Sequence, residues 1–335
     1  MTEGPEDQVF RMIIGYRATR LVALAVELGI PDRVAGQAKT AAALAAETGS
    51  HQASLKRFLQ GLCALGILTE DEQGRFGPTP LSNCLTPGQW AHALARMSPE
   101  EGYASWAELA YSVRTGKPAY ELVHGQPRWE HLATKPDAAQ RFNAAMAASS
   151  RLDGKALLEA CDLSRVSTVV DVGGGSGALI AAILATNPQM HGTILDLPAG
   201  MESAPEELDA AGVADRCRMV AGSFFDAAPA SADLYLLRWI LHDWDDKRAA
   251  RILEVCAEAM PADGRLLVIE RLMPDRFQPT PQDLRLVMAD LHMMVILGGL
   301  ERTEAQFREM LAGVGLSLNR KSPLPTGTWL LECSR

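Results

Sequence analysis

Apolar residues in the N-terminal part of the chain recur at the spacing of amphipathic helices. Residues 9–30 carry apolar side chains three and four positions apart, and the pattern stops at Gly29-Ile30-Pro31, where proline would break a helix. Two further helical patterns and two short strands follow, at residues 40–48, 54–65, 68–70 and 74–77. Helix, turn, helix and hairpin is the outline of a winged helix.

A winged helix can bind DNA or can pair two chains. The second helix of the pair has only Lys56 and Arg57 as basic residues, whereas its apolar residues form a seam of Phe58, Leu59, Leu62 and Leu65. A DNA-binding face needs clustered basic side chains. The pattern therefore favours dimerisation or core packing, and a ligand-sensing DNA regulator remains an alternative.

Strands and helices alternate from residue 166 onward, after a helical stretch over residues 90–158. The five strands are expected at residues 168–171, 193–196, 218–221, 234–238 and 266–270. This alternation is typical of a doubly wound parallel α/β sheet. After a long helix near residues 284–297, the segments 316–320 and 327–332 can close as a hairpin. We expect three regions, residues 1–95, 96–160 and 161–335.

Composition narrows the class of protein. The 335 residues suggest two domains, and 47% apolar with 22% charged residues is ordinary for a globular protein. The net charge of −9 disfavours a nucleic-acid partner. No apolar run reaches the ~18 residues of a membrane span, and the acidic N-terminus does not resemble a signal peptide. Six scattered cysteines form no C-x-x-C, so we expect a cytoplasmic protein without disulfides.

The most informative segment is residues 168–177, a β-branched strand that ends in Asp171 and leads into four glycines within five positions. Glycine lets a backbone turn sharply and approach a ligand, and the following helix adds unpaired N–H groups. The next strand ends at Asp196, which can accept hydrogen bonds from a ribose. NAD and S-adenosylmethionine both suit such a unit. The spacing of Asp171 with Gly173, Gly175 and Gly177 favours S-adenosylmethionine.

Polar residues gather at the carboxyl ends of the later strands, where open α/β sheets bind ligands. His242 and Asp243 follow the strand 234–238, and Glu270 ends the strand 266–270. An imidazole with an ordinary pKa of ~6.5 can act as a base near neutral pH, and Glu270 could orient its ring. We predict that His242 is a general base; the simpler interpretation is that it caps the loop before a helix beginning near Asp246.

Five ordered motifs resemble the S-adenosylmethionine-dependent small-molecule O-methyltransferases of the plant caffeate and chalcone type and their bacterial antibiotic-pathway relatives. They are Asp-Val-Gly-Gly-Gly-Ser-Gly (171–177), Asp-Leu-Pro (196–198), Leu-His-Asp-Trp (241–244), Glu270 and Gly-Gly-Leu-Glu-Arg-Thr (298–303). The resemblance covers nearly the whole chain. It implies a Rossmann-like methyltransferase sheet, an all-helical winged-helix dimerisation domain, a homodimer, an aromatic acceptor, S-adenosylmethionine as cofactor and no metal.

The resemblance also implies residue roles. His242 would remove the proton of the acceptor hydroxyl, with Glu270 and Glu301 flanking its imidazole and Asp243 beside it. The cofactor would be held by the glycine loop, by Asp196 at the ribose and by Leu197, Ser223, Phe224, Arg238 and Ser150. The acceptor pocket would be lined by Phe142, Asn143, Met146, Met288, His292 and Met293, with Met294 as a further methionine. Each of the methionines 288, 293 and 294 could equally be core.

One position departs from the family pattern. Ser223 stands where the family commonly has an acidic residue, which implies a weaker or altered hold on the adenine side. Asp226 lies three residues later and could compensate.

The expected chemistry is methyl transfer to a phenolic hydroxyl. A phenol has a pKa of ~10, so proton transfer to an imidazole of pKa ~6.5 is uphill by about 5 kcal/mol. Base removal concerted with attack avoids this barrier. Some bacterial relatives with the same fold are hydroxylases or decarboxylases, but they tend to have lost the base that His242 would supply here.

Overall fold

The computed structural model describes residues 4–335, except for the side chains of residues 98–101, and the chain divides into two compact units, Met1–Tyr103 and Ala104–Arg335. The first three residues of the acidic N-terminus therefore lie outside the described part. The expected boundaries at residues 95 and 160 stay predictions. Among the described helices, none is long and apolar enough to cross a bilayer.

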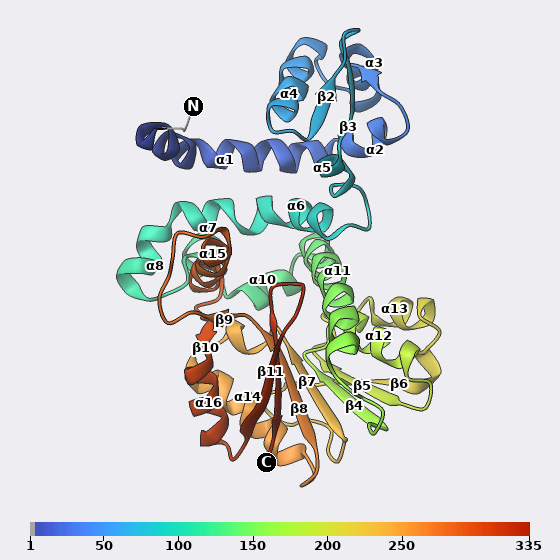
Figure 1. Cartoon of the computed structure of the whole chain (residues 1–335), viewed down its shortest axis with the longest axis vertical. Coiled ribbons are helices and arrows are strands. Elements are labelled where there is room, and N and C mark those ends of the chain that lie inside the picture. Colours follow the sequence, from blue (N-terminus) through green and yellow to red (C-terminus); the bar gives the residue numbers. More distant parts are fainter. Residues whose placement is uncertain (1–3) are drawn as a thin grey trace. The chain divides into compact units, whose positions relative to one another are not determined.

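The N-terminal unit combines helices with a small antiparallel sheet of order β1-β3-β2 (Figure 1). Its elements are α1 (Pro5–Glu27), α2 (Ile30–Ala35), β1 (Lys39–Thr40), α3 (Ala41–Thr48), α4 (Gln52–Ala64), β2 (Leu68–Glu70), β3 (Arg75–Pro78), α5 (Pro80–Asn83) and α6 (Trp90–Glu101). The predicted helix pair and hairpin are confirmed. The expectation of an all-helical domain was wrong because these three strands pair.

Pro31 does not simply end a helix, as the sequence pattern suggested. It occupies the first turn of α2, where its missing N–H has no helical partner to lose. The break comes two residues earlier, because Gly29 takes a left-handed conformation with φ of 61°.

The C-terminal unit is built on a seven-stranded sheet of order β11-β12-β8-β7-β4-β5-β6. The strands are β4 (Thr168–Val172), β5 (His191–Asp196), β6 (Cys217–Ala221), β7 (Leu234–Arg238), β8 (Arg265–Glu270), β11 (Ser317–Pro323) and β12 (Trp329–Ser334). Strands β4 to β8 are parallel, as predicted. The C-terminal hairpin is also confirmed and joins the sheet antiparallel to β8.

Helices cover both faces of this sheet (Figure 1). The helices and 3₁₀ turns of the unit are α7 (Tyr103–Ala107), α8 (Leu109–Thr115), α9 (Ala119–His124), α10 (Arg128–Ala133), α11 (Pro136–Ala160), α12 (Ala178–Thr186), α13 (Ala204–Ala210), η1 (Ala214–Arg216), η2 (Leu241–Asp243), α14 (Asp246–Ala259), α15 (Pro281–Ile296) and α16 (Glu304–Gly313). Val169 belongs to a buried apolar cluster that includes residues of α11, α12 and α13, and Val170 belongs to a second cluster that includes residues of α14 and α16. The strands are therefore apolar on both sides, as a doubly covered parallel sheet requires.

A short pair of parallel strands, which was not predicted, positions residues 298–303 in the site. Strand β9 (Leu272–Met273) follows β8 directly, and β10 (Arg302–Thr303) pairs with it after α15. This pairing brings residues 298–303 to the carboxyl ends of β7 and β8, although about 30 residues separate the two segments in sequence.

We predict that Gly192→Ala destabilises the C-terminal unit. Gly192 is buried on β5, and an added Cβ would lie 2.7 Å from Ile180 Cδ1 and 2.9 Å from Leu184 Cδ1 of α12. Both side chains are fully buried and cannot move freely, so we expect a loss of about 1–3 kcal/mol in unfolding free energy, measured by urea denaturation. Gly313→Ala, where the added Cβ meets nothing within 4 Å, is the control. Equal midpoints for the two variants would contradict the prediction.

Candidate active site

The glycine loop between β4 and α12 has the geometry of a ligand cradle. Gly173, Gly175 and Gly177 have φ values of 73°, 51° and 74°, which residues with a side chain rarely adopt. A Cβ on Gly173 would lie 2.4 Å from Ile240 Cδ1. The loop thus needs glycine both for its conformation and for its close approach to the segment that precedes His242.

Two carboxylates lie beneath this loop. Asp196 accepts hydrogen bonds from the backbone N–H of Gly175 (2.8 Å) and of Leu197 (2.6 Å), so it fixes the loop directly. Asp171 is buried, and its Oδ2 has no hydrogen-bond partner among the described residues. Burial, reinforced by Asp196, raises the pKa of Asp171 to about 7. An orphaned buried oxygen beside a glycine cradle fits a bound polar cofactor, as predicted for S-adenosylmethionine.

The other predicted cofactor residues lie at the ends of the neighbouring strands. Phe224 comes within 3.5 Å of the position that a Cβ on Gly173 would take, which puts its ring beside the loop. Ser223 Oγ accepts the N–H of Phe225 (3.2 Å), so it caps its own turn. Leu197 is exposed and could face a ligand. Their roles toward the cofactor stay predictions.

Arg238 is buried and held by helix α11. Its Nε donates to Asp153 Oδ2 (2.8 Å), and its Nη2 donates to Ser149 Oγ. Arg238 thus contacts Ser149, the residue directly before the predicted Ser150. Arg238 is the last residue of β7. Its positive charge counteracts the rise in the pKa of Asp171, so Arg238 lies at the cofactor edge of the sheet.

His242 lies in the turn η2, directly after β7, and its side chain is buried. Its Nδ1 is 3.0 Å from Glu301 Oε1 and 3.5 Å from Glu270 Oε2, while its Nε2 is 3.3 Å from Asp243 Oδ1. All four predicted catalytic residues therefore meet around one imidazole. Loop capping alone does not account for a histidine with a carboxylate at each ring nitrogen.

The two glutamates make different contacts, whereas the sequence predicted the same role for both. Glu301 makes the short contact to the imidazole. Glu270 mainly holds the backbone of the turn, because its Oε1 accepts the N–H groups of Ile240 (3.1 Å), Leu241 (2.9 Å) and His242 (3.3 Å). The sequence assigned ring orientation to both glutamates; the structure gives most of it to Glu301.

The ordinary histidine pKa assumed from sequence was wrong for this site. Burial alone would lower the pKa of His242, but Glu270, Glu301 and Asp243 together raise it to about 9. Burial also raises the pKa of Glu270 to about 7 and that of Asp243 to about 6. Burial opposes ionisation of Glu301 as well, yet His242 and Arg271 hold its pKa below the usual range. Glu301 is therefore the ionised partner of His242.

The same cluster has the spacing of a metal site, since ligand atoms of His242, Glu270 and Glu301 lie within 4.8 Å of one another. A cation there would compete with the imidazole Nδ1–H and with Arg271, whose Nη1 donates to Glu301 Oε1 (2.8 Å). The observed contacts are those of a hydrogen-bonded ion network. That the reaction needs no metal stays a prediction.

The predicted acceptor residues lie on α11 and α15. Phe142 packs edge-on against Trp129 and lies under the Arg128 guanidinium, while Asn143 donates to Ala199 O at 3.5 Å. Met146 is half-buried. Of the methionines on α15, Met288 is exposed, Met293 is buried in the core, and Met294 packs against a cluster around Tyr120.

His292 is fixed in one tautomer. Its Nδ1 accepts the indole N–H of Trp106 at 3.1 Å, so its own hydrogen is on Nε2. Burial, together with the positive charges of Arg128, Arg271 and His242, lowers the pKa of His292 to about 4. Next to a charged histidine, this side chain is therefore a neutral hydrogen-bond donor.

Several site residues were not found from sequence. Trp239 has φ of 55°, unusual for a bulky residue, and both the Arg238 and the Arg271 guanidinium lie over its ring, at 3.9 Å and 4.3 Å. Arg271 and Trp239 directly follow Glu270 and Arg238, so adjacency to a predicted site residue was the available clue. Asp153 and Trp106 carried no comparable clue.

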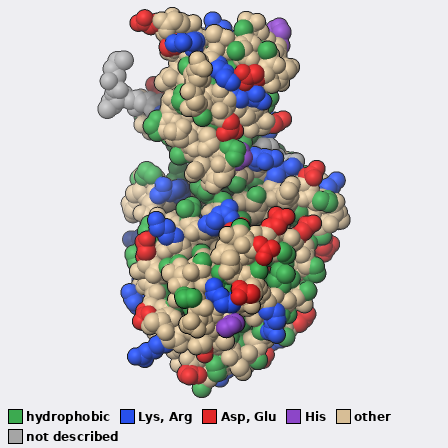
Figure 2. Space-filling view, turned by 90° about the vertical axis from the view of Figure 1, so that its right-hand side faces the viewer, with side chains coloured by type: hydrophobic (Ala, Val, Ile, Leu, Met, Phe, Trp, Pro, Cys, Tyr) green, Lys and Arg blue, Asp and Glu red, His purple; other side chains and the backbone are tan. Residues whose placement is uncertain are grey.

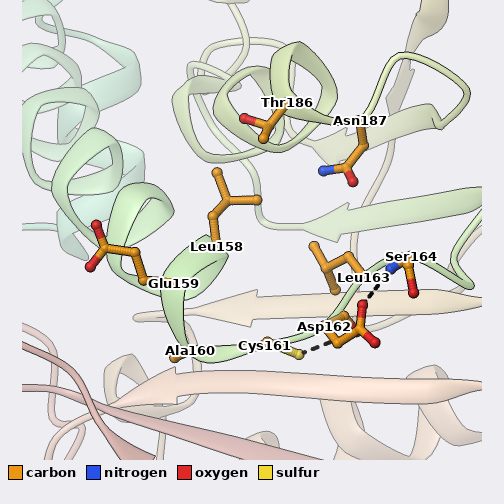
Figure 3. A pocket seen from close by; sticks show the side chains of 9 residues that line it. All are labelled: Leu158, Glu159, Ala160, Cys161, Asp162, Leu163, Ser164, Thr186 and Asn187. Carbon is orange, nitrogen blue, oxygen red and sulfur yellow. Dashed lines mark hydrogen bonds between the residues drawn. The ribbon is translucent and has the colours of Figure 1, made fainter.

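A hollow of about 440 Å³ lies elsewhere, where α11 ends and before β4 begins (Figure 3). It is lined by Leu158, Glu159, Ala160, Cys161, Asp162, Leu163, Ser164, Thr186 and Asn187. This edge carries the amino end of β4 and so faces away from the glycine loop. It is not the site at which the predicted residues meet.

Comparison with known proteins agrees with this geometry. Residues 106–317 match the O-methyltransferase domain family, and residues 10–88 match the O-methyltransferase dimerisation domain. The chain is 39% identical over 97% of its length to phenazine O-methyltransferase PhzM of Lysobacter antibioticus, of which it covers 94%. It is 36% identical over 88% of its length to aclacinomycin 10-hydroxylase RdmB of Streptomyces purpurascens, of which it covers 80%.

Solved structures show the same architecture. A structure described as LaPhzM has a TM-score of 0.92 and 38% identity, with 99% of both chains covered. An O-methyltransferase from neocarzinostatin biosynthesis, NcsB1, in complex with S-adenosylmethionine and 2-hydroxy-5-methyl naphthoic acid, has a TM-score of 0.81 and 34% identity over 95% of both chains. The NAD interpretation and the DNA-regulator interpretation find no support in these matches. The chain belongs to the S-adenosylmethionine-dependent O-methyltransferase family and, as its sequence predicted, is an enzyme of that class.

Proposed function

We propose that this enzyme methylates a phenolic hydroxyl of an aromatic small molecule in secondary metabolism, with His242 as general base. The observation that carries the proposal is the imidazole with Glu301 at Nδ1, at the strand ends beside the glycine loop. The relatives support it, since PhzM is named for a phenazine and NcsB1 was crystallised with a naphthoic acid.

The carboxylates set both the tautomer and the strength of the base. Because Nδ1–H donates to Glu301, the neutral ring has its lone pair on Nε2. A proton taken up at Nε2 is stabilised by Asp243 Oδ1 at 3.3 Å. With the pKa of His242 at about 9, transfer from a phenol of pKa ~10 is uphill by only about 1.4 kcal/mol. The drawback is that only about 1 imidazole in 100 is neutral at pH 7.

The remaining residues would bind and orient the reactants. S-adenosylmethionine, when bound, supplies the methyl group as an electrophilic sulfonium. Asp196 and Asp171 with the glycine loop would hold its ribose side, and Leu197, Phe224 and Ser223 its adenine. Arg238 and Ser150 would lie at the methionine end. The acceptor would lie between α11 and α15, and the Nε2–H of His292 would donate to an oxygen of its ring system.

A hydroxylase activity is the second candidate, because RdmB is among the relatives. The intact imidazole–carboxylate network favours methyl transfer, since a base is what that reaction needs from the protein. We also propose a cytoplasmic location, which suits the six free cysteines. A nucleic-acid partner is not proposed: on the face shown in Figure 2, acidic and basic side chains are interspersed.

The first prediction concerns the base. In His242→Gln, transfer of labelled methyl groups to a panel of phenols should fall by at least ~10², while the Kd for S-adenosylmethionine, measured by calorimetry, stays within about twofold. His51→Gln, at an exposed histidine of the N-terminal unit, is the matched control. Normal turnover of the His242 variant would remove this residue from the role. Hydroxylated rather than methylated products from the native enzyme would favour the second candidate.

The second prediction concerns pH. Because the base must be unprotonated, kcat/KM should rise with pH to an apparent pKa near the value of about 9 for His242. In Glu301→Gln, a negative charge 3.0 Å from Nδ1 is lost, so this pKa should fall toward ~6.5. The acceptor's own ionisation is the same in both enzymes, so the difference reports the protein. If the apparent pKa in the pH profile of kcat/KM is the same in Glu301→Gln as in the native enzyme, the assignment of His242 as the base is contradicted.

The third prediction concerns the homodimer. Helix α1 carries exposed apolar side chains at Val9, Phe10, Met12, Ile13 and Tyr16, with Ile13 68% exposed. Such a face on a segment within the dimerisation domain suits a second copy of the chain. Ile13→Glu should shift the protein to monomer in analytical ultracentrifugation, whereas Lys56→Glu, elsewhere in the same unit, should not. A dimer that survives the Ile13 change would place the interface elsewhere.

A further inference from the structure

The backbone N–H groups of the turn that carries His242 point to one side, and its carbonyls point to the other. On the N–H side, Glu270 accepts all three donors from residues 240–242. The carbonyls of this buried turn also need partners, since an unpaired buried carbonyl is unfavourable by about 1–3 kcal/mol, and the backbone N–H groups of Asp243 and Trp244 reach the carbonyls of Ile240 and Leu241 only at 3.3 Å. The residue that supplies them is not among the catalytic residues predicted from sequence.

Arg302 fills that role. Its side chain is fully buried, Nη1 donates to the carbonyl of Leu241 (2.8 Å), and Nη2 donates to the carbonyl of Trp244 (2.8 Å). Its Nε donates to Asp246 Oδ1 at 2.9 Å, which fixes the orientation of the guanidinium plane. The two carbonyls bracket His242, one on each side along the chain.

Consecutive residues on an extended strand point to opposite sides. Directly before β10, Glu301 turns its carboxylate to the imidazole, while Arg302, the first residue of β10, turns its guanidinium to the carbonyls of the same turn. Gly299 fits the rest of this loop against the turn, since a Cβ there would lie 2.1 Å from the carbonyl oxygen of His242. One short segment thus fixes both the ring and the backbone of the base.

We propose that Arg302 is a positioning residue for catalysis: its planar guanidinium holds the carbonyl side of the 241–244 turn, so that the imidazole keeps Nδ1 on Glu301 and Nε2 beside Asp243. The inference rests on the proposed role of His242 as base. A guanidinium presents its donors in a rigid fork, which an ammonium group cannot reproduce. Lysine at this position keeps the charge and loses the geometry.

The test is Arg302→Lys. A misplacement of about 1 Å at a reacting group lowers rates by about 10², so we expect kcat to fall by that order while the Kd for S-adenosylmethionine is unchanged. The control is Arg216→Lys. Arg216 also donates to three backbone carbonyls, those of Leu184, Asn187 and Met190, but at the end of α12 away from the site. We expect a lower Tm for this variant and a nearly normal kcat.

A readout that a purely structural role would not move is the pKa of His242, followed by NMR of its imidazole C–H signals without acceptor. Since lysine preserves the charge, a looser contact with Glu301 should lower this pKa in Arg302→Lys, and it should stay unchanged in Arg216→Lys. The proposal is overturned by an unmoved His242 pKa, or by a kcat loss no larger than that of Arg216→Lys.

A second variant tests the proposal if Arg302→Lys does not fold. Asp246 is 70% exposed, so Asp246→Ala removes the partner of Nε at the solvent end with little effect on folding. A lower His242 pKa in this variant supports the proposal, and an unchanged pKa overturns it. If the native enzyme methylates no phenol at all, the proposed function fails, but the NMR comparison still decides whether Arg302 positions the imidazole.

Discussion

The active site depends on the burial of one imidazole among three carboxylates. Removing charges from water is unfavourable, and here the attraction between His242 and Glu301 offsets part of that cost. Arg271 and the backbone of the turn add further contacts to the glutamates, and Asp290 accepts the Glu301 N–H at 2.9 Å, while Glu270 Oε2 and Glu301 Oε2 have no hydrogen-bond partner among the described residues. The network ties β7, β8, β10 and α15 together. Loss of either His242 or Glu301 removes the buried ion partner of the other at 3.0 Å.

The scaffold explains why these groups meet. Parallel strands deliver their carboxyl ends to one edge, which brings the glycine loop, Asp196, His242 and Glu270 together. Glu301 arrives by another route, through the two-residue pairing of β10 with β9. The cofactor edge and the base are coupled by contact as well, because Ile240 packs against the position where Gly173 lacks a side chain.

Sequence reasoning placed the parallel strands, the C-terminal hairpin and the four residues around His242. These features follow from local patterns: β-branched runs, glycine spacing and motifs at strand ends. It did not reveal strand β1, which adds to the predicted hairpin of the N-terminal unit, or the β9–β10 pair, because two-residue strands have no periodicity. The pKa of His242 was misjudged for a related reason, since the spacing of residues 242, 270 and 301 along the chain does not give the distances between their charges. The partners Asp153 and Trp106 depend on helix packing, which a single sequence does not encode locally.

The fixed tautomer of His292 has a consequence for enzyme engineering. Its donor belongs to α15 and is held by Trp106 rather than by the network around the base. Under the proposed acceptor role of Phe142, Met146 and His292, libraries that vary these residues would change acceptor preference without contacting the turn, whereas a side chain at Gly299 would clash with the carbonyl oxygen of His242.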